Sequence, residues 1–301
     1  MVINRSGPIA DRFWSIAHPG MPLFLLDGDK PAIFDGGLAC LANVYIDHIR
    51  SVLGERTLSF CFLTHSHFDH IGSVFWLKKA FPRMDVCANS RLATILERPR
   101  AVEVIKMLSK SAEDMVRGEV KIDGNLPGFE PFGIDRPVSD GDRIGIGDGL
   151  SVEVYATPGH TRDCMSYYIP ERKILIASEA LGIPVEDGYI YTDFLIGYDV
   201  YIESVKKLGT LDVDVLCFGH SFVYTGEDAK NYVPRVQACA EDFYNMTARF
   251  LEEEDGDLEA VKQRVKALEY DSRPGAKQPE PAYLLNLEAR ILAVKQKMEA
   301  G

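Results

Sequence analysis

The sequence predicts an α/β fold over residues 1–225, followed by a helical part over residues 226–301. Two observations support this division. In the first part, short apolar runs of the length of buried strands alternate with segments in which apolar residues recur at helical spacing. The second part shows helical spacing in three amphipathic stripes. The chain of 301 residues is therefore expected to form one sheet-containing domain with a C-terminal helical appendage.

The N-terminal segment is expected to form three short strands, over residues 13–16, 22–26 and 32–34. The last two are separated by Asp-Gly-Asp-Lys at 27–30, a turn sequence that predicts a hairpin. A helix over 41–53 follows, because its apolar residues recur at the spacing of one helix face.

A group of potential metal ligands comes next, in the heptapeptide Thr-His-Ser-His-Phe-Asp-His that begins at Thr64 and follows an apolar, strand-like run. His65 and His67 lie on one side of an extended backbone, whereas Asp69 and His70 come after a turn and point elsewhere. This arrangement suits two adjacent metal ions better than one. A chance cluster of polar turn residues is much less favoured, because histidine is scarce in this chain and costly to bury unpaired.

Three further candidate ligands each follow an apolar run and a tight turn. They are His160 after residues 151–156, Glu179 after residues 173–177, and His220 after residues 213–218. Strands that end in such residues place them at the edge of a sheet, where a substrate can reach them. The sequence thus predicts one site built from four strand ends.

The middle of the chain interrupts this rhythm of strands. The elements expected there are a helix over 71–80 with its N-terminus facing the metals, a strand over 84–88 and a mainly helical stretch over 91–117 with a break at Pro99. Residues 118–137 are rich in Gly and Pro and are expected to be irregular. The resulting insertion, about 91–137, either lies over the ligand end of the sheet or is a passive surface excursion.

The segment 180–197 and the residue after it carry four aromatic side chains soon after Glu179. They are Tyr189, Tyr191, Phe194 and Tyr198. Two interpretations stay open: they form the wall of a substrate pocket, or they are core aromatics beneath a loop. The three C-terminal helices are expected from apolar stripes over 229–250, 258–268 and 284–298.

Composition excludes several classes of function. The net charge of −12 argues against nonspecific nucleic-acid binding, which depends on Lys and Arg that neutralise phosphates. The sequence has no stretch long enough to span a membrane and no apolar signal core at its N-terminus, so a cytoplasmic protein is expected. Its six cysteines lack metal-binding spacing and are expected to be reduced core thiols. The oligomeric state stays open, with a homodimer among the alternatives.

The order of these motifs resembles the metallo-β-lactamase superfamily, over roughly residues 13–222. The resemblance implies a four-layer αββα sandwich and two metal sites. By that resemblance His65, His67 and His160 hold one metal ion, and Asp69, His70 and His220 hold the other. The acidic residue between the metals is usually Asp in the family, and Glu179 takes its place here.

Two further features bear on the resemblance. The turn Asp35-Gly36-Gly37 resembles the early Asp-x-Gly turn of the superfamily, in which the acid orients a metal ligand. An ordinary turn acid is the alternative. The helical appendage is similar to those of the quinolone-signal-response thioesterases and of the glyoxalase II branch, where it helps to cover the active site. Cys164 departs from that group, which often has a histidine at this position.

The resemblance implies a hydrolase in which a hydroxide bound by two metal ions cleaves a small-molecule thioester, ester or lactone. Asp69 would act both as a ligand and as a proton shuttle. Zinc or iron, and also manganese, suit the mixed nitrogen and oxygen ligands. A coenzyme A thioester would need local cations, and the candidates are Arg235, Arg249, Lys262, Arg264 and Lys266.

Three alternatives to this hydrolase remain. The first is a mononuclear-iron oxidoreductase of the persulfide dioxygenase type, and the second is a phosphodiesterase. The third is a ligand-binding signalling protein with an altered metal site, for which Glu179 is the main argument.

Overall fold

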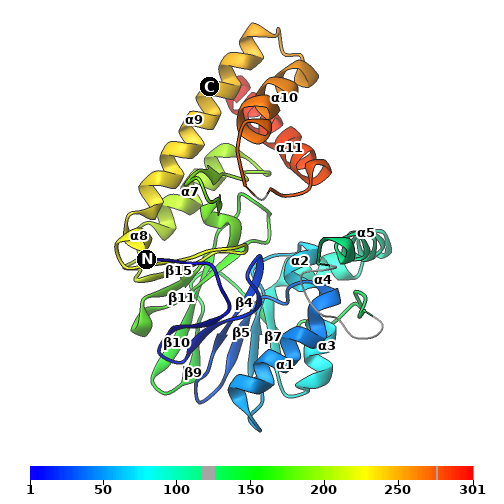
Figure 1. Ribbon diagram of the computed structural model, residues 1–301, viewed down its shortest axis with the longest axis vertical. Helices are drawn as coiled ribbons and strands as arrows, with labels where there is room; N and C mark the ends of the chain where they lie inside the picture. The colour runs from blue at the N-terminus through cyan, green and yellow to red at the C-terminus, as the bar shows by residue number, and fades with distance from the viewer. Residues whose placement is uncertain (117–125, 276, 301) are drawn as a thin grey trace.

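The computed structural model describes residues 1–116, 126–275 and 277–300, and within these it contains two seven-stranded sheets that pack face to face. Helices lie on the outer side of each sheet (Figure 1). The four-layer αββα sandwich expected from the sequence is therefore confirmed. The predicted irregular residues 118–125 lie outside the described part of the chain.

The first sheet has the strand order β2-β3-β4-β5-β6-β7-β8. Its strands are β2 (Gly7–Ala10), β3 (Phe13–His18), β4 (Met21–Leu26), β5 (Ala32–Phe34), β6 (Phe60–Phe62), β7 (Asp85–Asn89) and β8 (Arg136–Val138). The predicted hairpin is confirmed as the antiparallel pair β4 and β5. The irregular structure predicted through Pro137 is wrong at its end, because Arg136 and Pro137 pair with β7. Proline is tolerated there because β8 is the edge strand.

The second sheet has the strand order β1-β16-β15-β12-β11-β10-β9. Its strands are β1 (Val2–Ile3), β9 (Arg143–Gly147), β10 (Leu150–Ala156), β11 (Met165–Ile169), β12 (Ile174–Ile176), β15 (Val215–Cys217) and β16 (Val223–Thr225). The three apolar runs that precede His160, Glu179 and His220 thus become β10, β12 and β15, as predicted.

The core between the sheets is closed by aromatic side chains directly behind the segment 64–70, which carries the first candidate ligands. The ring of Tyr167 lies 5.2 Å from that of Phe62 and 6.0 Å from that of Phe34, measured between centroids. The Tyr167 hydroxyl donates to the carbonyl of Leu63 at 2.6 Å, and Met165 N donates to the Thr64 carbonyl at 2.7 Å. These bonds join the two sheets where this segment begins.

The helices beside the first sheet are α1 (Ala42–Leu53), α2 (Phe68–Ile71), α3 (Val74–Ala80), α4 (Ser90–Leu96), α5 (Pro99–Ser111) and α6 (Glu113–Val116). The break at Pro99 is confirmed, since this proline is in the first turn of α5. The single helix predicted over 71–80 is wrong. The chain divides at Gly72 into α2 and α3, where Gly72 N and Ser73 N donate to the carbonyls of Gly37 and Gly36 instead of to carbonyls within the helix.

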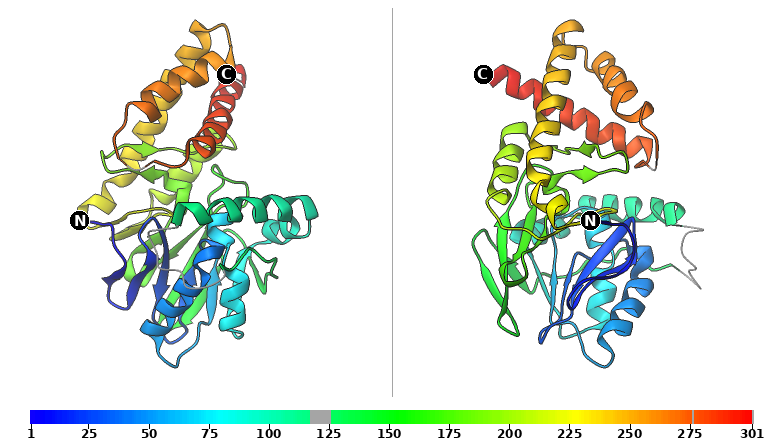
Figure 2. Two further views of the ribbon diagram at one scale, coloured as in Figure 1. Left: turned by 45° about the vertical axis from the view of Figure 1, so that its right-hand side comes forward. Right: turned by 60° about the vertical axis from the view of Figure 1, so that its left-hand side comes forward.

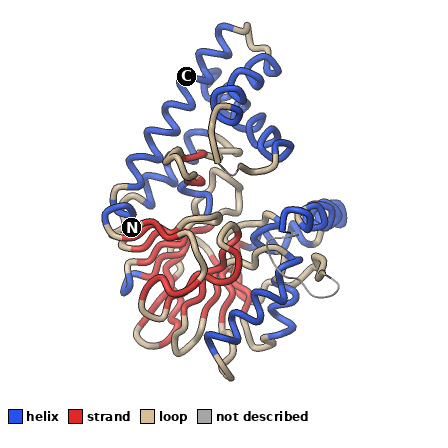
Figure 3. Tube along the Cα trace, viewed as in Figure 1, coloured by secondary structure: helices blue, strands red, loops and turns tan. Residues whose placement is uncertain are grey.

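The C-terminal part is helical, as predicted. Helix α7 (Tyr198–Leu208) still belongs to the first part. The helices beyond residue 225 are α8 (Glu227–Lys230), α9 (Tyr232–Glu253), α10 (Leu258–Lys266) and α11 (Glu280–Ala300), and a π-helical segment, Ala267–Asp271, extends α10. Helices α9, α10 and α11 lie together beyond one end of the sheets (Figures 1 and 2). Figure 3 shows that this end of the molecule is mainly helical, whereas both sheets lie at the other end with helices beside them. The predicted boundary at 225 coincides with the end of β16, and the division into two domains stays a prediction.

The predicted loop over 180–197 contains a small hairpin of β13 (Ile183–Pro184) and β14 (Ile190–Tyr191). Tyr191 and Phe194 are buried against α9 and α11, which favours the interpretation as core aromatics. Within the described residues, none of the helices is both long and apolar enough to cross a membrane. The six cysteines are free thiols, five of them buried.

Candidate metal centre

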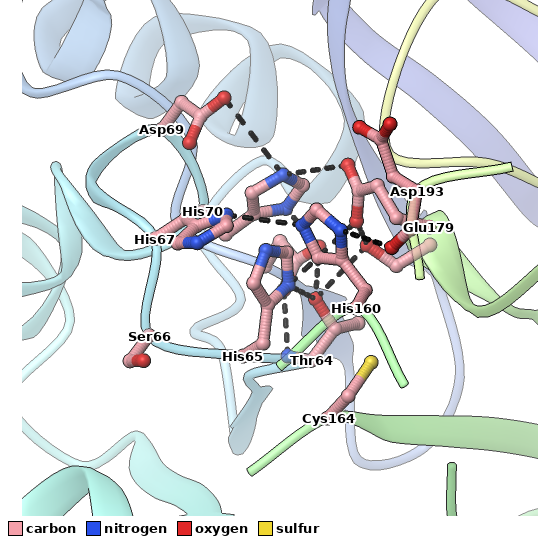
Figure 4. Close-up of polar contacts among 12 residues, drawn as sticks. Thr64, His65, Ser66, His67, Asp69, His70, His160, Cys164, Glu179 and Asp193 are labelled. Carbon is pink, nitrogen blue, oxygen red and sulfur yellow. Dashed lines mark hydrogen bonds and ion pairs between the residues drawn. The ribbon is translucent and has the colours of Figure 1, made fainter. Parts of the chain in front are cut away.

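The seven predicted ligands meet at one end of the sheets, from strands that belong to both (Figure 4). His65 and His67 follow β6, Asp69 and His70 lie on α2, His160 follows β10, Glu179 lies in the 3-10 helix Ser178–Leu181 after β12, and His220 follows β15. Asp69 and His70 follow a bend at Ser66 and lie on the short helix α2, which gives the change of direction predicted from the sequence. This helix directs both side chains into the site.

The first group of ligands consists of three imidazoles, those of His65, His67 and His160. His67 Nδ1 lies 3.1 Å from His160 Nε2, and His65 Nε2 is buried without a hydrogen-bond partner among the described residues. Burial, and to a smaller extent the neighbouring imidazole of His160, lowers the pKa of His67 to about 4. Burial also lowers the pKa of His65 and of His160. The three imidazoles are thus held neutral, which is the form that binds a metal ion.

The second group consists of Asp69, His70 and His220. Asp69 Oδ2 lies 3.7 Å from His220 Nε2 and 4.0 Å from His70 Nε2. Burial alone would lower the pKa of His70, but the carboxylates of Glu179 and Asp35 raise it well above its usual value. The pKa of His220 is likewise raised by Glu179 against the effect of burial. The carboxylates of this group therefore favour positive charge between them, whether imidazolium or metal cation carries it.

Glu179 contacts the second group through one oxygen. Its Oε1 lies 3.0 Å from His70 Nε2 and 2.9 Å from His220 Nε2. Its Oε2 accepts a hydrogen bond from Ser178 Oγ and lies 3.7 Å from His65 Nδ1, the nitrogen on the far side of that ring from Nε2. Glu179 also forms a third possible ligand group with His65 and His70, so its carboxylate lies between the first and second groups. Burial would raise the pKa of Glu179, but the imidazoles of His70 and His65 hold it well below its usual value.

The spacing of these atoms fits divalent cations. In a tetrahedral site with metal–ligand distances of about 2.0–2.2 Å, neighbouring ligand atoms are about 3.3–3.6 Å apart. The separations between ligand atoms are 3.1 Å in the first group and 3.7 and 4.0 Å in the second, and all ligand atoms of a group lie within 4.8 Å of one another. The buried and unpartnered His65 Nε2 also needs an electrophile to avoid the cost of desolvation.

Asp35 orients one of the ligands from behind. Its Oδ2 lies 2.9 Å from His70 Nδ1, and its two oxygens accept from the backbone N and the hydroxyl of Thr64 at 2.7 and 3.0 Å. With Nδ1 bound to the carboxylate, His70 directs Nε2 into the site. This contact favours the orienting role over that of an ordinary turn acid. Asp35 has a φ of 65°, a conformation that non-glycine residues adopt at a cost and that often marks functional sites.

Three contributors to the site are missing from the sequence-based prediction. Thr64 Oγ1 lies 3.1 Å from Ser178 Oγ, so these hydroxyls connect Asp35 to Glu179. The backbone carbonyl of Asp193 lies 3.2 Å from His160 Nδ1 (Figure 4). Thr64 and Ser178 are adjacent to predicted ligands and their hydroxyls were a usable signal. Nothing in the sequence points to Asp193.

Gly219 explains why a glycine precedes His220. A Cβ at this position would meet Glu179 Oε1 and would lie 2.7 Å from His70 Cε1. The backbone of the last loop therefore approaches the ligands more closely than any side chain would allow. A glycine at this position is therefore needed for the arrangement of Glu179 and His70.

Exposure differs among the ligands of the second group. The side chains of Asp69 and His220 are 18% and 22% exposed, whereas those of His70 and Glu179 are 3% and 2% exposed. Solvent therefore reaches the candidate centre at Asp69 and His220, and His67 of the first group is also partly exposed.

Comparison with known proteins agrees with this geometry. Residues 22–220 match the metallo-beta-lactamase superfamily. The chain is 31% identical over 190 residues to a hydroxyacylglutathione hydrolase from Brucella anthropi, covering 60% of this chain and 55% of that protein. It is 26% identical over 226 residues to the hydroxyacylglutathione hydrolase of Brucella ovis, covering 73% and 63%. The chain thus spans less than two thirds of the length of these relatives.

Solved structures support the fold. An archaeal metallo-beta-lactamase superfamily protein from Sulfolobus tokodaii superimposes with a TM-score of 0.57 at 19% identity, over 97% of this chain and 98% of that one. A subclass B3 metallo-beta-lactamase of Bradyrhizobium japonicum gives a TM-score of 0.56 at 19% identity, over 81% and 94%. The family match extends over most of the chain and includes every predicted ligand. This chain therefore belongs to the metallo-β-lactamase superfamily.

Proposed function

We propose that this protein is a metal-dependent hydrolase that cleaves the thioester of a small acyl substrate at a centre of two divalent metal ions. The observation that supports this most is the convergence of seven ligands into two adjacent groups with one side open to solvent. The relatives named hydroxyacylglutathione hydrolase support a thioester as the bond, ahead of an ester or a lactone.

The residues divide between the two ions as follows. His65, His67 and His160 would hold one ion, and Asp69, His70, His220 and Glu179 would hold the other. Two bound cations supply a hydroxide near neutral pH and polarise the carbonyl of the substrate. With five imidazoles, two carboxylates and no thiolate, the ligand set suits zinc, iron or manganese.

Asp69 is proposed to be both ligand and proton shuttle. Its Oδ2 faces His70 and His220, and its side chain stands at the solvent-facing side of the centre. A carboxylate in this position can accept a proton from water and pass it towards the departing group. A thiol leaves readily as the thiolate, because its pKa is far below that of an alcohol or an amine. This favours thioesters over amides as substrates.

The proposed substrate carries few phosphates. The five cations considered for coenzyme A face other partners: Arg264 pairs with Glu253 and Glu254 at 2.6 Å, Lys262 with Glu259 at 2.8 Å, Lys266 with Asp271 at 2.7 Å, Arg249 with Glu253 at 3.7 Å, and Arg235 donates to the Gly188 carbonyl at 2.8 Å. The four cations paired with carboxylates offer a polyphosphate little attraction, and among the described residues Arg235 alone of the five keeps its charge without a carboxylate beside it. An acyl group on a small thiol carrier fits this surface better than coenzyme A.

The intact second group argues against the alternatives. A mononuclear-iron oxidoreductase would need only one group, yet Asp69, His70 and His220 face one another beside the first group. The net charge of −12 disfavours a nucleic-acid phosphodiesterase. A signalling protein with an altered site would not be expected to keep Asp35 aligned on His70 at 2.9 Å.

The test is elemental analysis of the purified protein together with a panel of acyl-glutathione, acyl-coenzyme A, lactone and phosphodiester substrates. We expect two ions per chain and the highest kcat/KM on an acyl-glutathione or a similar small thioester. A His220→Ala variant should lose one ion and most activity, whereas His48→Ala, on the exposed side of α1, should retain both. One iron per chain, or preference for phosphodiesters, would contradict the proposal.

A further inference from the structure

A short segment around Asp193 is bound to the turn that carries His160. The carbonyl of Asp193 lies 3.2 Å from His160 Nδ1, and the carbonyl of Gly159 accepts from Ile196 N at 2.9 Å. These two bonds hold the segment and the turn together from both sides. They also fix the ring of His160 so that Nε2 faces His67 Nδ1.

The side chain of Asp193 points the opposite way, away from the imidazoles (Figure 4). Its Oδ2 accepts from Asn286 Nδ2 at 3.2 Å, and its Oδ1 lies 4.0 Å from Arg290 Nε. Both partners are on α11, and Asp193 is only 1% exposed. One residue therefore contacts the metal centre with its backbone and the C-terminal helices with its side chain.

Arg290 is itself fixed in place. Its guanidinium donates two bonds of 2.8 Å to the carboxylate of Glu269 and lies 3.6 Å from the ring centroid of Phe243 on α9. Glu269 also accepts from the hydroxyls of Tyr189 and Tyr283 at 2.6 and 2.9 Å. A buried ion pair adds little stability compared with apolar packing, but it specifies one arrangement of the elements that it joins.

We propose that Asp193 is a positioning residue through which the C-terminal helices hold His160 in the metal centre. This rests on the proposed metal centre and adds a role for residues beyond 225. The coupling reaches only the first group of ligands. In the second group, among the described residues, His70 Nδ1 contacts Asp35 at 2.9 Å and His220 Nδ1 contacts Met21 Sδ at 3.2 Å, both in the first half of the chain. Loosening α11 should therefore weaken the binding of one ion and leave the binding of the other unchanged.

The test is a competition titration of the full-length protein with zinc, resolved into two binding constants. In Asp193→Ala and in the milder Asn286→Ala, we expect the affinity of one ion to fall about 10- to 100-fold, the range typical for residues that orient a metal ligand, with the other unchanged. Asp193→Asn keeps an acceptor for Asn286 and should therefore retain most of the affinity that Asp193→Ala loses. The control Glu288→Ala removes an exposed residue of α11 that pairs with Lys262 at 3.2 Å, and should change neither constant.

A second readout does not depend on metal. Amide exchange in the metal-free protein should become faster over residues 190–197 in Asp193→Ala than in Glu288→Ala. The proposal is overturned if both binding constants fall equally, if neither changes, or if exchange over 190–197 is unaffected. If the wild-type protein binds no metal, the proposed function fails, and the exchange experiment alone decides whether Asp193 couples α11 to this segment.

Discussion

Replacement of Glu179 by Asp removes one methylene and withdraws the carboxylate by about 1.5 Å, the length of one C–C bond. In the native arrangement Oε1 lies 3.0 Å from His70 Nε2 and 2.9 Å from His220 Nε2. The shorter side chain would leave this oxygen roughly 4.5 Å from both nitrogens, too far to share a cation with them at metal–ligand distances of about 2.0–2.2 Å. It would also lose the hydrogen bond from Ser178.

We therefore expect Glu179→Asp to lower the affinity for the ion in the second group on the order of 100-fold, which corresponds to about 2.8 kcal/mol of binding free energy. The assay is the zinc titration described above, run beside kcat/KM for the best thioester. Glu179→Gln is the matched control, since it keeps the length and removes the charge. If length matters most, Gln should retain more metal than Asp. A gain in turnover for Glu179→Asp would refute this reasoning and would show that the position has drifted from an ancestral Asp.

Four further predictions follow from contacts in the structure. Gly219→Ala should displace Glu179 and His70 and lower metal affinity with little change in helix content, checked by titration and circular dichroism. Arg290→Met should cost about 3–5 kcal/mol of unfolding free energy in a denaturant titration, because the carboxylate of Glu269 stays buried and unpaired, whereas Arg249→Met at an exposed pair should cost about 0–1 kcal/mol. The pKa of His67 is lowered from 6.5 to about 4, so between these pH values the unfolded metal-free chain binds more protons than the folded one. Its stability should thus fall on acidification through this window, and more steeply than in a His67→Gln variant. A chelator should abolish activity and lower Tm, and zinc should restore both; an unchanged Tm would count against a structural contribution from the ions.

Much of the fold could be predicted because its signals are local. The strand over 32–34 and the hairpin before it follow from a short apolar run and a turn of Asp and Gly, and the structure has the same limits for β5. Pro99 marks the start of α5 for a similar reason, since proline is favoured in the first turn of a helix. The ligands also follow from local sequence, because each lies in the segment that follows a predicted strand.

The parts that sequence reasoning missed depend on contacts between distant segments. The predicted helix divides at Gly72 because backbone N–H groups there donate to Gly36 and Gly37, and no helical periodicity reveals these contacts. The pairing of Pro137 with β7 is likewise set by the neighbouring strand. Asp193 and Arg290 look like ordinary surface charges in the sequence, and only the fold buries both at 1% exposure.

The ligands come from both sheets, from segments as far apart as His65 and His220. A chain in which only one sheet has formed presents only some of the ligands of each group. Tight binding of the ions therefore requires that the two sheets have packed together. Metal uptake should then report the last stage of maturation. During refolding, the arrival of zinc in the protein would lag behind the recovery of helical structure.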